Sequence, residues 1–258
     1  MEPMKVISLQ SGSNGNCIYV EAGQCRLLLD AGISAKQAEL RLAEHGRSIR
    51  SVDAVLISHD HSDHARGIGV FQRKFGLPVY ATAATLRAAQ SRLALGPLGE
   101  VRPFCAGETL KLPGLSVQTI PTPHDGADGS AFVLDDGRRR LGVLTDLGHP
   151  FAGLGEMIAT LDAVVLESNY DPDMLDCGPY PEFLKRRIAG LGGHLSNDES
   201  AGLVKAWASP RLQWACLAHL SEQNNDPDLA LGVYRRTVGQ SMALIVASRY
   251  HAGEVLEV

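Results

Sequence analysis

The chain has 258 residues, of which 45% are hydrophobic and 21% are charged, and its formal net charge at pH 7 is −5. This length and composition are typical of a globular protein, and they exclude a disordered, collagen-like or coiled-coil chain. The sequence holds no run of about 18 consecutive apolar residues, so we expect no membrane-spanning segment. The acidic balance argues against a protein that coats nucleic acid by charge alone.

The cysteines are scattered along the chain and form no C-x-x-C pair. They are Cys17, Cys25, Cys105, Cys177 and Cys216. A disulfide framework and a thiolate zinc site are therefore not expected. The first residues, MEPMKVISL, lack the basic region and apolar stretch of a signal peptide. We expect a protein of the reducing cytoplasm.

In the first half of the chain, short apolar or alternating runs separated by turn residues predict strands. The expected strands are 5–9, 17–21, 26–30, 53–58, 101–104, 109–112 and 115–120. Three helices are expected at 34–45, 67–75 and 83–95. Ser34 is the expected cap of the first helix, and Gly46 is expected to stop it.

In the second half, segments 130–135 and 140–144 predict a hairpin, because the Asp136-Gly137 pair between them is a strong turn signal. Further strands are expected at 162–167, 214–218 and 243–247, and helices at 181–189, 197–208 and 227–238. The segment between Asp146 and His219 thus has space for about two helices and a strand. The mixture predicts an α/β fold. Since no internal repeat or long linker is visible, we expect one domain over residues 1–258.

Several expected strands end abruptly in polar side chains. Asp30, His59, Asp146, Glu167 and His219 each follow or close an apolar run. Buried strands that end in this way place their polar residues along one edge of a sheet. We expect a functional site at that edge.

The sequence from His59 to His64 has three histidines and two aspartates within the pattern H-x-H-x-D-H. Imidazole nitrogen and carboxylate oxygen are preferred ligands of catalytic zinc. Side chains two residues apart can converge on one ion, while the next pair turns toward a second. The alternative is a solvated polar turn, which this density of metal-binding side chains disfavours.

This motif resembles the signature of the metallo-β-lactamase superfamily, and the resemblance extends from Asp30 to His219. It implies a four-layer αββα sandwich and two divalent metal ions. Zinc or manganese is expected, with iron or nickel as alternatives. The implied ligands of one ion are His59, His61, His124 and Asp146, and those of the other are Asp63, His64, His219 and Asp146. Asp30 matches the aspartate that supports the metal loop and is not itself a ligand. Without the family pattern, His124, Asp146 and His219 would each have an ordinary structural explanation.

Glu167 and His194 resemble the glutamate and histidine loops of RNase Z, another member of this superfamily. There the two side chains form a pair that protonates the leaving oxygen, since a carboxylate raises the pKa of the histidine that it holds. The alternative is a surface charge and a helix-entry residue. The long tRNA-binding arm of RNase Z has no room between Asp125 and Thr145, and an inserted second domain has none before His219.

The remaining match is to the compact YycJ/WalJ-type branch. It covers the segments SGSNGNCIYV, LISHDHSDH, GHLSNDESA and LAHLSEQNN. This resemblance implies a 5′-to-3′ exonuclease that hydrolyses phosphodiester bonds in single-stranded or frayed DNA. Asp63 is expected to orient the attacking water and accept its proton, and His194, held by Glu167, to protonate the leaving 3′-oxygen.

Basic residues near the predicted site are candidates for contact with the nucleic-acid backbone. They are Arg66, Arg73, Lys74, Lys185, Arg186 and Arg187. A solvated helix face is an equally good explanation for each of them. Two other functions compete with the nuclease. One is a lactonase or thioester hydrolase that acts on a small molecule. The other is a binding module without activity, which would require a damaged set of ligands, and no ligand is missing.

Overall fold

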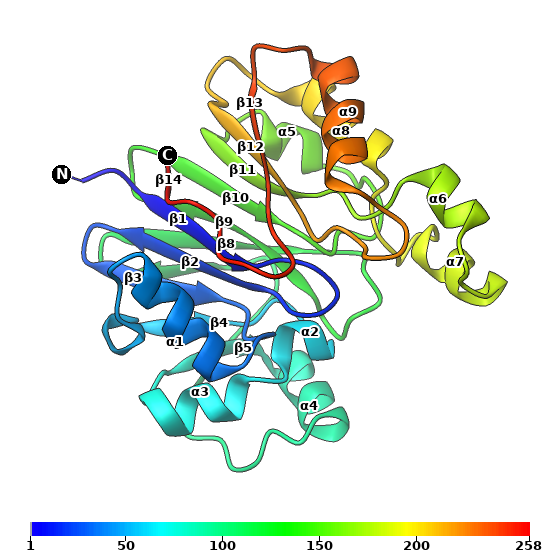
Figure 1. Ribbon diagram of the computed structural model, residues 1–258. Coiled ribbons are helices and arrows are strands. Elements are labelled where there is room, and N and C mark those ends of the chain that lie inside the picture. Colours follow the sequence, from blue (N-terminus) through cyan, green and yellow to red (C-terminus); the bar gives the residue numbers. More distant parts are fainter. Residues whose placement is uncertain (1) are drawn as a thin grey trace.

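Two seven-stranded β-sheets lie face to face at the centre of the computed structural model, which describes residues 2–258 (Figure 1). The first sheet has the order β14-β1-β2-β3-β4-β5-β6, and the second has the order β13-β12-β11-β10-β9-β8-β7. The strands of the first sheet are β1 (Lys5–Gln10), β2 (Cys17–Ala22), β3 (Cys25–Leu29), β4 (Ala54–Leu56), β5 (Val79–Thr82), β6 (Val101–Phe104) and β14 (Leu256–Glu257). Those of the second sheet are β7 (Thr109–Leu112), β8 (Leu115–Pro121), β9 (Ser130–Asp135), β10 (Arg140–Leu144), β11 (Ala163–Glu167), β12 (Trp214–Ala218) and β13 (Ala243–Val246).

Helices cover the outer face of each sheet (Figure 1). The helices of the first half are α1 (Ala35–Glu44), the 3₁₀-helix η1 (Ile49–Ser51), α2 (Ser62–Ala65), α3 (Ile68–Phe75) and α4 (Ala83–Arg92). Those of the second half are α5 (Leu154–Ile158), α6 (Pro172–Cys177), α7 (Glu182–Ile188), α8 (Asn197–Trp207) and α9 (Pro227–Val238). None of the described helices is both long and apolar enough to cross a membrane.

The apolar residues of β3 show how one strand serves two layers. Leu27 and Leu29 pack between the sheets with residues such as Phe132, whereas Leu28 packs with Leu42 and other residues of the helical layer. Side chains of a strand alternate between its two faces, so a strand buried on both faces must be apolar throughout. The four-layer αββα architecture that the sequence predicted is confirmed.

Both sheets combine an antiparallel half with a parallel half. Strands β3 to β6 are parallel neighbours in the first sheet, and β10 to β13 are parallel neighbours in the second. Parallel strands end at the same edge of a sheet. The residues predicted for the site follow or close β3, β4, β10, β11 and β12, so the parallel halves bring them to neighbouring edges.

Sequence patterns located most elements but missed short ones. The helix expected at 34–45 is α1, where Ser34 and Gln37 form a capping box, and the expected hairpin is β9 and β10. The expectation of about two helices between Asp146 and His219 is wrong, since four helices, α5 to α8, lie there around β11. Helices α5 and α6 have only 5 and 6 residues and show no full amphipathic period. Strands β5 and β14 were not expected either. The assignment of residues 1–258 to one domain stays a prediction.

The α1 cap gives a test of the local folding signals. The Ser34 hydroxyl oxygen accepts a hydrogen bond from the Gln37 amide at 3.1 Å. Ser34→Ala leaves that amide without its partner, so we expect the free energy of unfolding in urea to fall by about 0.5–2 kcal/mol. Ser91→Ala is the control, because the exposed Ser91 lies in the last turn of α4 and bonds only the Ala88 carbonyl. An equal loss in both variants would contradict the capping role.

Candidate metal centre and active site

The turns that carry three of the predicted site residues have an uncommon backbone conformation. Asp30, Asp146 and His219 have φ angles of 65°, 56° and 57°. Among the described residues, Asp128 is the fourth non-glycine residue with positive φ. Such conformations cost on the order of 1–3 kcal/mol each and are concentrated at functional sites. Here they turn a carboxylate or an imidazole sharply at the end of a strand.

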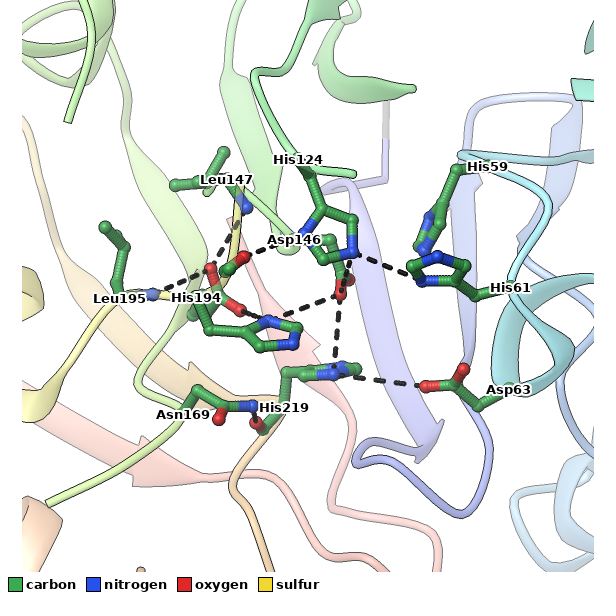
Figure 2. Close-up of polar contacts among 12 residues, drawn as sticks. His59, His61, Asp63, His124, Asp146, Leu147, Asn169, His194, Leu195 and His219 are labelled. Carbon is green, nitrogen blue, oxygen red and sulfur yellow. Dashed lines mark hydrogen bonds and ion pairs between the residues drawn. The ribbon is translucent and has the colours of Figure 1, made fainter. Parts of the chain in front are cut away.

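These turns surround a cluster of histidine rings (Figure 2). Neighbouring rings have centroids between 4.2 and 5.4 Å apart. The rings belong to His59, His61, His64, His124, His194 and His219. The structure therefore brings together histidines that are up to 160 residues apart (219 − 59) in the sequence.

Four overlapping sets of donor atoms among the described residues are spaced to hold a metal ion, and the two sets considered next share no residue. In the first set, His59, His61 and His124 each offer one nitrogen, and these atoms lie within 4.8 Å of one another. In the second set, Asp63, His64 and His219 offer one atom each within the same limit. The family resemblance implied all of these residues as ligands, and their assignment to two metal ions stays a prediction.

The Asp146 carboxylate lies between the two sets, as Figure 2 shows. Its Oδ1 atom is 3.7 Å from His124 Nε2 and 3.4 Å from His219 Nε2, and its Oδ2 atom is 3.3 Å from His64 Nε2. Asp146 Oδ2 and His59 Nε2 are buried, and neither makes a hydrogen bond with another described residue. Buried polar atoms without a partner are costly, and a bound cation would satisfy both. The donor set therefore fits divalent metal ions.

The outward nitrogens of two histidines are held by a polar group at the end of β3 and β4. Asp30 accepts hydrogen bonds from the Ser58 amide at 2.7 Å and from the Ser58 hydroxyl at 2.9 Å, and its Oδ2 lies 2.7 Å from His64 Nδ1. Ser58 Oγ also lies 2.9 Å from His59 Nδ1. A hydrogen-bond partner on the nitrogen that faces away from the metal fixes the orientation of a ligand ring. Asp30 thus occupies the supporting position that the family resemblance implied.

Two more histidines are held in the same way. His124 Nδ1 lies 2.7 Å from the Gly193 carbonyl oxygen, and His219 Nδ1 lies 3.2 Å from Asn16 Oδ1. In both cases Nε2 is left to face the cluster. Asn16 Nδ2 also lies 2.9 Å from the Nε2 atom of His64, and a metal ion bound to His64 would replace this contact.

The protonation states of two buried side chains, His59 and Asp146, suit metal binding. Burial lowers the pKa of His59, and the neighbouring imidazoles lower it further. Burial alone would raise the pKa of Asp146, but the surrounding histidines, His219 first, hold it well below its usual value. At neutral pH His59 is therefore neutral and Asp146 is ionised. These are the forms in which the two side chains bind metals.

Glu167 and His194 form the predicted pair beside this cluster. Glu167 is fully buried, its Oε1 lies 2.6 Å from His194 Nδ1, and its Oε2 accepts hydrogen bonds from the amides of Leu147 and Leu195. Burial opposes protonation of His194, but the Glu167 carboxylate outweighs it and raises the pKa of the ring. The surface location that was the alternative for Glu167 is excluded.

A cavity of about 190 Å³ opens onto the cluster. Besides predicted site residues, its lining includes side chains that the sequence analysis did not single out: Ser13, Asn169, Tyr180, Leu184, Ile188 and Ser221. These positions carry ordinary polar or apolar residues in loops and short helices. Only their place in the fold brings them to the cavity.

Asp60 lies inside the histidine motif, and the sequence pattern alone assigns no role to it. It is 1% exposed, and its carboxylate accepts hydrogen bonds from Arg92 Nη1 at 2.5 Å and from the Ala127 amide at 2.7 Å. These bonds connect the motif to α4 and to the loop that follows His124. The signal was present in the sequence, because a charge buried in so short a loop requires partners.

Most of the basic residues considered for backbone contact have local partners. Arg66 and Arg73 donate hydrogen bonds to backbone carbonyl oxygens, and Lys74 forms an ion pair with Glu39. Of the six basic candidates, Arg187 alone is among the residues described as lining the cavity. A structural explanation is therefore sufficient for the three residues after the metal loop.

Comparison with known proteins agrees with this geometry. Residues 25–214 match the family described as "Beta-lactamase superfamily domain". The chain belongs to this superfamily. It is a metal-dependent hydrolase, and its fold implies divalent metal ions, for which the histidine and aspartate sets provide a site.

Two curated relatives match most of the chain. Exodeoxyribonuclease YycJ of Bacillus anthracis is 33% identical over 250 residues, which cover 97% of this chain and 92% of the relative. Exodeoxyribonuclease WalJ of Streptococcus pneumoniae is 34% identical over 226 residues, which cover 86% of this chain and 83% of the relative. The predicted resemblance to this branch of the superfamily is confirmed.

Solved structures show the same fold across the whole chain. The metallo-β-lactamase fold protein YhfI of Bacillus subtilis has a TM-score of 0.76 at 18% identity, with all of both chains covered. The short form of human tRNase Z has a TM-score of 0.66 at 14% identity, covering 98% of this chain and 99% of the other. At these identities the likeness concerns the fold alone.

The outer partner Ser58 gives a test of the metal centre. Ser58→Ala removes the hydroxyl that contacts Asp30 and His59, while the Ser58 amide still bonds Asp30. Loss of such a partner typically lowers metal affinity by about 10- to 100-fold. We expect this change in a competition titration of zinc or manganese against a chelator.

Ser8→Ala is the matched control for this titration. Ser8 is also buried, and its hydroxyl has no hydrogen-bond partner among the described residues. Its removal should leave metal affinity unchanged. Unaltered affinity in Ser58→Ala, or an equal loss in both variants, would show that Ser58 does not orient the ligands.

Proposed function

We propose that this protein is a phosphodiesterase that acts as a 5′-to-3′ exonuclease on DNA with two divalent metal ions. The observation that carries the proposal is the Glu167–His194 pair beside the Asp146 carboxylate. His194 Nδ1 lies 2.6 Å from Glu167 Oε1 and 3.7 Å from Asp146 Oδ1. Release of a 3′-oxygen requires an acid at the reacting bond, and a histidine with a raised pKa is suited to provide it.

The ligands of the two metal ions would form two sets that have Asp146 in common. We propose that His59, His61, His124 and Asp146 hold one ion, and that Asp63, His64, His219 and Asp146 hold the other. Ions bound there would lower the pKa of the attacking water and neutralise charge on the phosphate oxygens. Zinc and manganese both suit this mixture of imidazole and carboxylate, and iron and nickel are the alternatives.

Asp63 would orient the attacking water. Burial raises its pKa, but His64 and His219 outweigh burial and lower the value to about 2. Asp63 is therefore ionised at neutral pH and accepts hydrogen bonds readily. A group with so low a pKa is a weak base. We therefore assign Asp63 to orientation of the water rather than to removal of its proton.

His194 would protonate the leaving oxygen. Its Nδ1 atom is committed to Glu167, and the ring borders the cavity, so Nε2 is the nitrogen left for the substrate. Glu167 holds the ring in place through a carboxylate that is itself fixed by the Leu147 and Leu195 amides. General acid catalysis of this kind contributes about 10²- to 10⁴-fold in rate.

Two further observations support a DNA substrate with a free single strand. The relatives from Bacillus anthracis and Streptococcus pneumoniae are both named exodeoxyribonucleases. The cavity of about 190 Å³ is smaller than the roughly 300–1,000 Å³ of pockets that enclose drug-sized ligands. A cavity of this size suits the end of a single DNA strand better than a base-paired duplex. We also propose a cytoplasmic location, because all of the cysteines are unpaired, as expected in a reducing compartment.

The function can be tested with oligonucleotides labelled at the 5′ or the 3′ end. We expect metal-loaded protein to release nucleotides from the 5′ end of DNA, and His61→Ala to abolish the reaction. In His194→Ala, kcat on DNA should fall by about 10²- to 10⁴-fold, because the 3′-oxygen leaves without a proton. Bis-p-nitrophenyl phosphate should lose much less activity, since its leaving group is stable as an anion.

His251→Ala is the matched control, because His251 is exposed and its side chain makes no hydrogen bond with another described residue. Its activity should equal that of the unaltered protein. Failure to cleave DNA or bis-p-nitrophenyl phosphate with either manganese or zinc would contradict the proposal. Hydrolysis of a lactone or thioester by the same preparation would then favour the small-molecule alternative.

A further inference from the structure

Helices α6 and α7 form a unit at the side of the molecule, apart from the main helical layers (Figure 1). Their apolar residues make a small cluster of their own, separate from the three large apolar clusters. Its members are Tyr170, Leu175, Tyr180, Leu184 and Ile188. The two sheets do not require this unit for their packing, so its sequence is available for another purpose.

One side of this unit is a wall of the catalytic cavity. Tyr180, Leu184, Arg187 and Ile188 border the same cavity as His194 and the proposed metal ligands. This wall is apolar and aromatic except for Arg187, whereas the other lining residues carry imidazoles, carboxylates and small polar side chains. A nucleotide whose phosphate lies at the metal ligands would therefore meet an apolar surface with its sugar and base.

The same unit has the most exposed large apolar side chains. Leu191 is 74% exposed and Phe183 is 69% exposed, which are the two highest values for large hydrophobic residues in the described chain. Phe183 lies on α7 itself, and Leu191 follows that helix by three residues (191 − 188). Exposed aromatic groups next to a catalytic cavity are typical of recognition surfaces.

Helix geometry connects the cavity to this exposed surface. Successive helical residues are about 100° apart, so neighbours around α7 differ by three or four positions in sequence. Moving around the helix from the cavity, the order is Leu184, Arg187, Phe183 and Arg186. We call these four residues the α7 stripe. It alternates apolar and cationic side chains from the cavity to the solvent.

The two cations of the stripe differ in their partners. Arg187 forms two hydrogen bonds with Asp125, at 2.7 and 3.0 Å, and Asp125 in turn lies 3.4 Å from His61 Nε2. Arg186 is exposed and makes no hydrogen bond or ion pair through its side chain with the other described residues. Arg187 thus has a structural task beside the metal ligands, and Arg186 is available for a phosphate.

We propose that the α7 stripe binds the single-stranded DNA on its way to the metal centre. Phe183 stacks on a nucleobase next to the nucleotide in the cavity, and Arg186 pairs with a backbone phosphate. Alternating aromatic and cationic side chains bind single strands in this way without reading their sequence. This assignment rests on the proposed nuclease function, and it names the part of the chain that selects a polymer over a small phosphodiester.

The test compares two substrates of the metal-loaded protein. For each variant, kcat/KM is measured on a single-stranded oligonucleotide of about 12 nucleotides and on bis-p-nitrophenyl phosphate, and the first value is divided by the second. For Phe183→Ala, we expect this ratio to fall about 5- to 150-fold, because one base–aromatic stack is lost. For Arg186→Ala, the slope of log kcat/KM on the oligonucleotide against log salt concentration should become shallower by about 0.7. A loss of folding alone would lower both activities together and leave their ratio unchanged.

Leu40→Ala and Arg138→Ala are the matched controls. Leu40 is 53% exposed on α1, and Arg138 lies in the β9–β10 turn, at the end of β10 away from Asp146. Both should keep the ratio and the salt slope of the unaltered protein. If DNA is cleaved but Phe183→Ala keeps the activity ratio and Arg186→Ala keeps the salt slope, the α7 stripe does not bind the strand, and the nuclease function stands. If no phosphodiester is cleaved at all, the proposed function fails with it.

Discussion

The Asp146 carboxylate and the imidazoles around it are the interaction on which this site depends. Asp146 is 3% exposed, and nitrogens of His64, His124 and His219 lie 3.3–3.7 Å from its oxygens. A buried carboxylate is strongly unfavourable unless positive charge and polar contacts compensate it. Divalent ions held by the surrounding imidazoles and carboxylates would supply that charge. The cluster is therefore understandable as a metal centre, and it would be difficult to explain as part of an ordinary core.

The architecture provides the framework that this cluster needs. The parallel halves of both sheets end at neighbouring edges, and left-handed turns at Asp30, Asp146 and His219 direct their side chains there. Outer partners such as Ser58 and Gly193 then hold the rings. The strained backbone of Asp30, Asp146 and His219 and the unpaired buried atoms of His59 and Asp146 lie at the site, while apolar packing between and outside the sheets stabilises the rest of the fold.

The sequence was sufficient for the architecture, because the motif from His59 to His64 is dense and short apolar strands surround it. The assignment of the ligands stays a prediction. The sequence was insufficient where local signals are short or nonlocal. Helices α5 and α6 are too short for a full amphipathic period, and β14 pairs with β1 from the other end of the chain. Asn16 and Tyr180 belong to the site only through tertiary contacts. The segment before His219 was expected to be too short for a second domain. Its short α6–α7 unit nevertheless borders the cavity.

We propose that the buried cluster holds two metal ions with Asp146 between them. Anomalous diffraction from crystals of the manganese- or zinc-loaded protein tests it most directly. We expect two anomalous peaks, one bordered by His59, His61 and His124 and one by Asp63, His64 and His219, with the Asp146 carboxylate next to both. A single peak, or peaks elsewhere with this cluster unchanged, would contradict the proposal.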